Sequence, residues 1–61
     1  MKVIVYPVIV GKHTMWRADR WDNFGQLLAD GTLQLSKRSA VMEVKQEGDT
    51  VETEHLAEYP P

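Results

Sequence analysis

The sequence predicts a small α+β domain, in which an antiparallel sheet of four to five short strands carries a single helix packed on one face. Three observations support this class. Residues 2–10 form a run of branched and aromatic side chains typical of a strand. Residues 19–31 carry apolar side chains at helical spacing, and the later residues alternate in polarity as half-buried strands do. These elements fit one domain over residues 1–57, with residues 58–61 as a frayed C-terminal tail.

The first strand is the element around which the others must be organised. Its side chains alternate between two apolar faces: Ile4, Tyr6, Val8 and Val10 on one, and Val3, Val5 and Ile9 on the other. This pattern favours a central strand covered on both sides, whereas Pro7, which has no N–H, favours an edge or a bulge. One helix covers only one face. We therefore expect a homodimer or an obligatory partner, with Val3, Val5 and Ile9 in the buried contact.

A tight turn is predicted at Gly11-Lys12, where Gly11 supplies a positive φ. The segment that follows, residues 13–16, is either the second arm of a hairpin or an irregular approach to a helix. The helix itself is predicted over residues 19–31, with Asp19 as its N-cap and Gly31 in the left-handed conformation at its end. Its apolar stripe consists of Trp21, Phe24, Leu27 and Leu28. The missing side chain of Gly25 would let this helix approach the sheet closely.

The remaining strands are predicted after the helix. Residues 32–36 alternate as one strand, and residues 40–46 and 50–56 flank the turn at Glu47-Gly48-Asp49 as a hairpin. One face of this hairpin is charged and is expected to be exposed. The other face is expected to point to the core and carries Met42, Val44, Val51, Thr53 and His55.

Charge is distributed unevenly along the chain, although the net charge is only −2. Residues 1–42 hold six basic and three acidic side chains, whereas residues 43–61 hold one basic and six acidic ones. Such an acidic block either keeps a small domain in solution or docks on a basic groove, including one that normally holds nucleic acid. The candidate partner-binding carboxylates are Glu43, Glu47, Asp49, Glu52 and Glu54.

Two tryptophans lie five residues apart, so they point in different directions on a helix. If Trp21 anchors the predicted helix, Trp16 either caps the open end of the small core or, with Arg17, forms an interface anchor. Tryptophan and arginine are the residues most enriched in tightly packed interfaces. Trp16 and Arg17 therefore complete the set of candidate partner-binding residues.

The residues that carry chemistry do not form a catalytic pattern. The chain has no cysteine, so it offers neither disulfides nor thiolate metal ligands, and a cytoplasmic setting fits best. His13 and His55 lack metal-ligand spacing, and Ser36 and Ser39 have no neighbouring histidine. No apolar run approaches the length of a membrane span, and Pro7 argues against a signal peptide, so we expect a mature, soluble chain. We expect no enzyme activity, no cofactor and no metal.

These observations favour a small non-catalytic module that inhibits or regulates a protein partner. Short cysteine-free chains of this kind are typical of phage-encoded host-takeover or anti-defence proteins, of which anti-CRISPR proteins are one type, acting in the host cytoplasm.

The alternative is DNA binding. Residues 24–39, a predicted helix that ends in Ala-Asp-Gly-Thr-Leu and is followed by Lys37-Arg38, resemble the helix-and-wing arrangement of phage excisionase-type regulators over about a quarter of the chain. The resemblance implies duplex binding through Lys37 and Arg38. A second, basic recognition helix and a positive charge balance are missing from the sequence.

Overall fold

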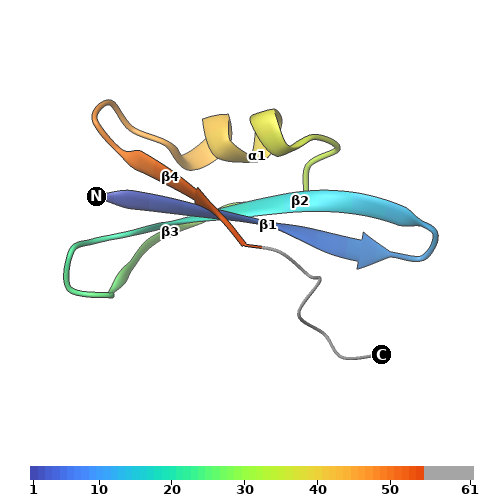
Figure 1. Ribbon diagram of the computed structural model, residues 1–61, viewed down its shortest axis with the longest axis horizontal. Coiled ribbons are helices and arrows are strands. Elements are labelled where there is room, and N and C mark those ends of the chain that lie inside the picture. Colours follow the sequence, from blue (N-terminus) through green and yellow to red (C-terminus); the bar gives the residue numbers. More distant parts are fainter. Residues whose placement is uncertain (55–61) are drawn as a thin grey trace.

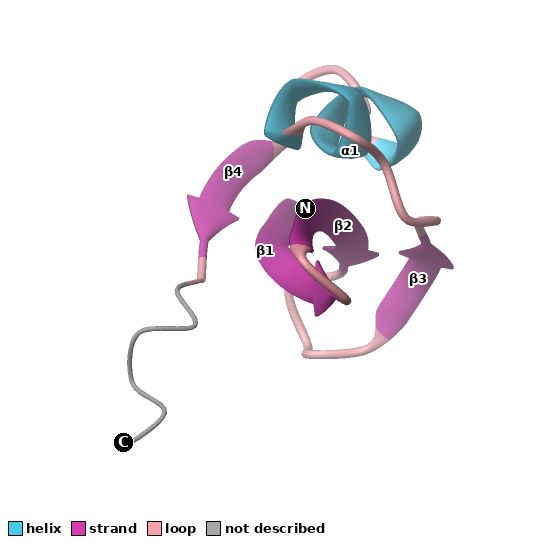
Figure 2. Ribbon diagram, turned by 90° about the vertical axis from the view of Figure 1, so that its right-hand side faces the viewer, coloured by secondary structure: helices cyan, strands magenta, loops and turns pink. Residues whose placement is uncertain are grey.

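The computed structural model describes residues 1–54 and folds them into four strands and one helix (Figure 1). The elements in chain order are β1 (Lys2–Val10), β2 (His13–Trp21), β3 (Leu27–Asp30), α1 (Lys37–Val44) and β4 (Thr50–Thr53). The strands form one sheet in the order β3-β2-β1-β4, and α1 lies on one side of it (Figure 2). The α+β class with a four-stranded sheet and a single helix is confirmed. The sheet is mixed rather than antiparallel, because β1 and β4 run parallel.

The β1–β2 hairpin is the longest feature of the fold. The two strands pair antiparallel without a break from Val10↔His13 to Lys2↔Trp21. Gly11 has a φ of +62° in the two-residue turn, which confirms the turn predicted there. The open question about residues 13–16 is thereby answered, since they are the start of a strand that continues to Trp21.

Pro7 lies in the half of β1 that has no partner on its second edge within residues 1–54. β4 pairs with β1 only over Lys2–Val5, and beyond this the backbone N–H of Glu54 donates to the oxygen of Val5 at 2.9 Å. Backbone groups alternate direction along a strand, so the nitrogen of Pro7, two residues further on, faces the same edge. A missing N–H breaks no ladder hydrogen bond there. Among the described residues, β1 is therefore central at its start and an edge strand at its end, and it needs no bulge at Pro7.

The helix predicted over residues 19–31 is wrong. Asp19–Trp21 close β2, and a turn then leads into β3. The Asp22 carboxylate accepts hydrogen bonds from the backbone N–H groups of Phe24 at 2.8 Å and Gln26 at 2.9 Å, and Gly25 has a φ of +83°. These turn interactions favour the reversal over a helix because they satisfy the backbone locally. Phe24, a member of the predicted apolar stripe, is 91% exposed.

The predicted C-terminal hairpin is also wrong in its first arm, because residues 37–44 form α1. Ser36 has an extended conformation and its side chain accepts from the N–H of Ser39 at 3.1 Å, which caps the helix. α1 carries the chain back along the sheet, so β4 enters parallel to β1 instead of antiparallel to a neighbour. The strand predicted over residues 32–36 is reduced to one bridge, Trp16↔Gln34. His55, the end of the predicted strand at 50–56 and the predicted tail at 58–61 lie outside the described residues.

The core lies between the sheet and α1. It consists of Val3 and Val5 on β1, Ala18 on β2, and Ala40 and Val44 on α1. Val3 and Val5 are 0% exposed, so the prediction that they form a contact with a second chain is wrong. Of that predicted set only Ile9 is at the surface, at 59% exposure. α1 covers the face that was expected to be free.

Replacing Val5 with alanine is expected to lower the free energy of unfolding by about 2 kcal/mol, because the methyl groups leave a cavity in a small core. Ile9→Ala, at an exposed position on the same face of β1, should change it by less than about 0.5 kcal/mol. Urea unfolding followed by tryptophan fluorescence measures both. Equal losses would indicate that both side chains are buried to the same degree, against this packing.

Candidate protein-binding surface

The face of the sheet opposite α1 carries apolar side chains that no helix among residues 1–54 covers. Directly paired residues of neighbouring strands share a face. The core residues Val5 and Ala18 are such a pair, so the residues next to them in sequence point the other way. This surface, here named the open face, consists of Ile4, Tyr6, Val8 and Val10 on β1 and Met15, Arg17, Asp19 and Trp21 on β2. Val10 is exposed, and the other members of the open face are half-buried.

A polar cluster lies in the middle of the open face. The Tyr6 hydroxyl donates to Asp19 Oδ2 at 3.1 Å. Arg17 Nε lies 3.7 Å from Asp19 Oδ1, and Arg17 Nη2 lies 3.9 Å from Asp30 Oδ1. Burial, followed by the hydrogen bond to Asp19, raises the pKa of Tyr6, so its hydroxyl remains a donor at neutral pH. The cluster orders a tyrosine and an arginine between apolar neighbours.

Arg17 and Trp16 do not form a joint anchor. They are neighbours on a strand and therefore point to opposite faces. Trp16 packs against the core on the α1 side, which fits the interpretation that it closes one end of the core. Arg17 lies on the open face with 39% of its side chain exposed. Its Nε is buried and finds no hydrogen-bond partner within the described residues.

All of the five predicted carboxylates except Asp49 lie on exposed residues, and within residues 1–54 Glu43 is the one of these four that accepts a hydrogen bond from a backbone N–H. Glu47 lies in the loop between α1 and β4, Glu52 lies on β4, and Glu54 follows it; all three are exposed. Glu52 is paired in register with Ile4 and lies 3.1 Å from Lys2 Nζ, a solvated ion pair with both side chains about half exposed. We name Glu47, Glu52 and Glu54 the acidic edge, because two of them lie on or beside the edge strand next to the open face.

Glu43 has a structural role that the sequence did not reveal. Its carboxylate accepts hydrogen bonds from the backbone N–H of Thr32 at 2.6 Å and from the Thr32 hydroxyl at 2.7 Å. These two bonds are the main reason that the pKa of Glu43 is lowered. Glu43 thus fastens the loop before α1 to the helix itself, and its oxygens are already engaged.

Asp49 is the least accessible of the predicted carboxylates, with 2% of its side chain exposed. Arg20 on β2 donates to it from Nε at 2.6 Å and from Nη2 at 3.3 Å, and the backbone N–H of Gln46 donates at 2.9 Å. The bond from Arg20, followed by that from Gln46, lowers the pKa of Asp49 to about 2. This bidentate ion pair connects the α1–β4 loop to β2. The Asp49 carboxylate is therefore not accessible as a docking site.

Sequence reasoning missed Tyr6, Asp19 and Trp21 as surface residues of one site. The alternation along β1 had already placed Tyr6 on an apolar face. The predicted helix includes Asp19 and Trp21, and this hid their place on β2, on the same face of the sheet as Tyr6.

Comparison with protein-family models, with curated proteins and with solved structures finds no match for this chain. No helix within residues 1–54 has the length and apolar character that a membrane crossing requires. Within the same residues, no three histidine, aspartate or glutamate side chains gather at a place where they could hold a metal ion.

Proposed function

We propose that this chain is a small non-catalytic protein-binding domain that inhibits or regulates a protein partner, and that the open face together with the acidic edge is its binding surface. The observation that carries the proposal is the partly accessible apolar side of the central strand β1, formed by Ile4, Tyr6 and Val8. In a chain with so small a core, leaving this apolar area in contact with water has a free-energy cost that a partner would remove.

The composition of the open face supports protein rather than small-molecule recognition. Apolar side chains surround one tyrosine, one tryptophan and one arginine, the residue types that contribute most to protein interfaces. Tyr6, Arg17 and Asp19 form a polar centre in this surface, and apolar side chains lie on either side of it.

The acidic edge favours a partner with a basic surface. Opposite charges across an interface speed association and fix orientation more than they raise affinity. A basic groove that normally holds nucleic acid fits this requirement, and occupying it would inhibit the partner by competition. This mode of action is the one expected of a phage-encoded anti-defence protein.

Changing Glu52 and Glu54 together to glutamine should slow association and leave the fold intact.

Photo-crosslinking from the open face tests the proposal. A photoreactive phenylalanine analogue replaces Val8 in the full chain, which is expressed in cells that naturally produce it. The matched control carries the analogue at Met42, which lies on α1 and is 68% exposed. The proposal expects a discrete protein adduct from position 8 that is absent from position 42. Equal labelling from both positions, or no adduct from position 8, would contradict it.

The resemblance to excisionase-type regulators depends on a helix that begins at residue 24. Residues 24–30 contain a turn and β3 instead of that helix. An electrophoretic shift assay on mixed-sequence duplex DNA decides between the two functions. We expect no saturable shift. A shift that weakens with salt and with Lys37→Ala would support DNA binding and overturn the protein-binding proposal.

A second copy of the chain is the other occupant that the open face could take. Sedimentation equilibrium at micromolar concentration separates the cases. A dimer that Val8→Asp converts to a monomer would assign the open face to self-association, whereas a monomer leaves it to a different protein.

A further inference from the structure

Within residues 1–54, one edge of β2 ends without a neighbouring strand at Thr14. Trp16 and Gln34 exchange two backbone hydrogen bonds, from Trp16 N to Gln34 O at 2.8 Å and from Gln34 N to Trp16 O at 2.7 Å. Continuing this antiparallel ladder would place Ser36 opposite Thr14. Ser36 instead caps α1, so the chain leaves the sheet at this point. The backbone N–H and C=O of Thr14 face outward, and no backbone group in residues 1–54 pairs with them at this edge.

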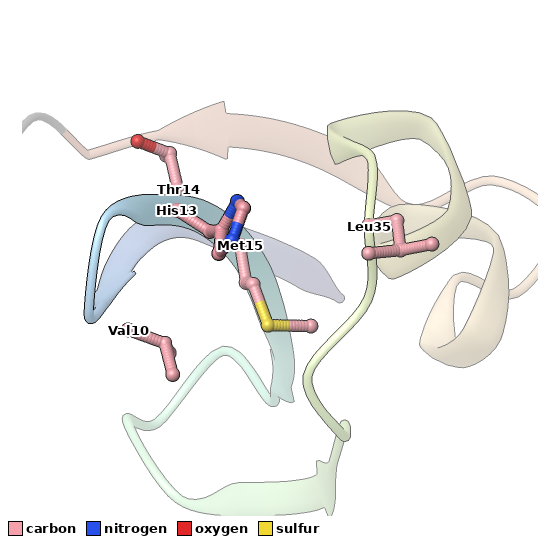
Figure 3. Close-up of a pocket in the computed structure, with 5 residues that line it drawn as sticks. All are labelled: Val10, His13, Thr14, Met15 and Leu35. Atoms are coloured by element: carbon pink, nitrogen blue, oxygen red, sulfur yellow. The ribbon is translucent and has the colours of Figure 1, made fainter.

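An apolar pocket of about 430 Å³ lies beside this edge. It is lined by Val10, His13, Thr14, Met15 and Leu35. Figure 3 shows Met15 reaching from β2 toward the loop that carries Leu35, with Val10 on the neighbouring strand. Leu35 is 86% exposed, so its side chain at the rim of the pocket is available to a ligand. The pocket has room for one large apolar side chain.

Cations flank the pocket along the chain on both sides. Lys12 precedes His13, and Lys37 and Arg38 follow Leu35 and occupy the first turn of α1. All three are exposed, and no carboxylate within residues 1–54 forms an ion pair with them, whereas Lys2, Arg17 and Arg20 each have one. Two cations at the positive end of a helix dipole are unfavourable by themselves. An anionic ligand would remove this repulsion.

We propose that the edge of β2 at Thr14 is a second docking site, which takes an extended acidic segment of a protein as an added strand with one apolar side chain in the Val10–Met15–Leu35 pocket. The segment pairs its backbone with Thr14 in the place that Ser36 vacates, and its carboxylates lie near Lys12, Lys37 and Arg38. Backbone pairing provides affinity, and the pocket and the charges provide selectivity. The pocket shares Val10 and Met15 with the open face, so we expect peptide binding at this site to compete with a partner that covers the open face.

Peptide selection tests the proposal without a known partner. A displayed library of random decapeptides is selected on the immobilised full chain, and enriched peptides are measured in solution by fluorescence polarisation. We expect acidic peptides with one apolar residue near the centre. Leu35→Asp should weaken their binding at least tenfold, and Lys37→Glu with Arg38→Glu should weaken it at least tenfold and remove most of its salt dependence. Because all three side chains are exposed, these variants are expected to fold.

The matched controls are Met42→Asp and Lys45→Gln, which alter an exposed apolar residue and an exposed cation elsewhere on or beside α1. Both should keep the affinity within about twofold. The amide proton of Thr14 should exchange more slowly with solvent when peptide is bound, which is the signature of strand addition. The proposal is overturned if no peptide is enriched, if Leu35→Asp binds as well as the unmodified chain, or if Thr14 is already protected by self-association without peptide.

Discussion

Replacing Gly31 with alanine is expected to lower the free energy of unfolding by about 3 kcal/mol, at the upper end of the cost of overpacking. A Cβ at this position would overlap the backbone carbonyl oxygen of Ala18 and would come within 3.0 Å of Glu43 Oε1. The obstacle is a backbone atom in the middle of the sheet, which cannot move aside as a flexible side chain could. The same close approach lets the N–H of Gly31 donate to Ala18 O at 2.9 Å.

Gly25→Ala is the control for this prediction. Gly25 has a φ of +83° and open space around its Cα, so alanine there costs only the strain of the left-handed conformation, about 1 kcal/mol. Guanidinium unfolding of the two variants should rank Gly31→Ala as clearly the more destabilised. A smaller loss for Gly31→Ala than for Gly25→Ala would show that the segment after β3 does not pack against β2 as described.

The second large effect is expected at Asp49. Its pKa is lowered from 3.8 to about 2, so its contribution to stability is fully present above the ordinary pKa and is lost as the pH falls from about 4 through about 2. The lowered pKa of Glu43 acts in the same direction. Asp49→Asn should lower the melting temperature at pH 7 by roughly 5–10 °C and should flatten its decline between pH 4 and pH 2.

Circular dichroism melts across this pH range measure the effect. Glu52→Gln is the matched control, because Glu52 also forms an ion pair, with Lys2, but both partners are solvated and such pairs contribute little. The melting temperatures of Asp49→Asn and Glu52→Gln should therefore differ clearly at pH 7 and become similar near pH 2. An acid profile of Asp49→Asn that matches the unmodified chain would mean that the pair with Arg20 does not hold the loop.

The hairpin could be predicted because its signals are local. Branched side chains favour an extended chain in β1, and Gly11 offers a positive φ at the reversal. The helix could not be placed because two local patterns compete. Residues 19–31 have apolar spacing suited to a helix, yet Asp22 and Gly25 make a turn, and pairing with β1 extends β2 to Trp21. Pairing of β2 with the distant strand β1 determines that these residues form a strand. The spacing of apolar residues within one segment contains no information about such pairing.

The true helix has a weak signature in sequence. Its two buried side chains, Ala40 and Val44, are small and lie four residues apart. Its first turn contains Lys37 and Arg38, whose positive charges interact unfavourably with the positive end of the helix dipole. Ser36 is its clearest mark, as an N-cap. Because the sequence does not mark this helix clearly, it predicts a strand over residues 40–46. It also predicts that Glu43 lies free on a charged surface. Its hydrogen bonds to Thr32 depend on tertiary structure that the spacing of charges does not encode.

The sequence indicated an uncovered apolar face on β1 but named the wrong one. Both faces of β1 are apolar, so alternation alone does not say which of them the helix covers. The structure places Val3 and Val5 beneath α1 and leaves Ile4 and Val8 partly accessible on the other side. The face predicted to bind a partner is therefore the open face, and partner binding stays a prediction.

The most direct test of that expectation is a methyl-detected NMR measurement with a soluble gadolinium chelate. The chelate speeds relaxation of methyl groups that solvent reaches. In the free chain, Val8 and Met15 should be strongly affected and Val5 should not. In the complex with the protein identified by crosslinking, Val8 and Met15 should be shielded while Met42 on α1 stays accessible. Shielding of Met42 with Val8 and Met15 still accessible would contradict the open face as the binding surface.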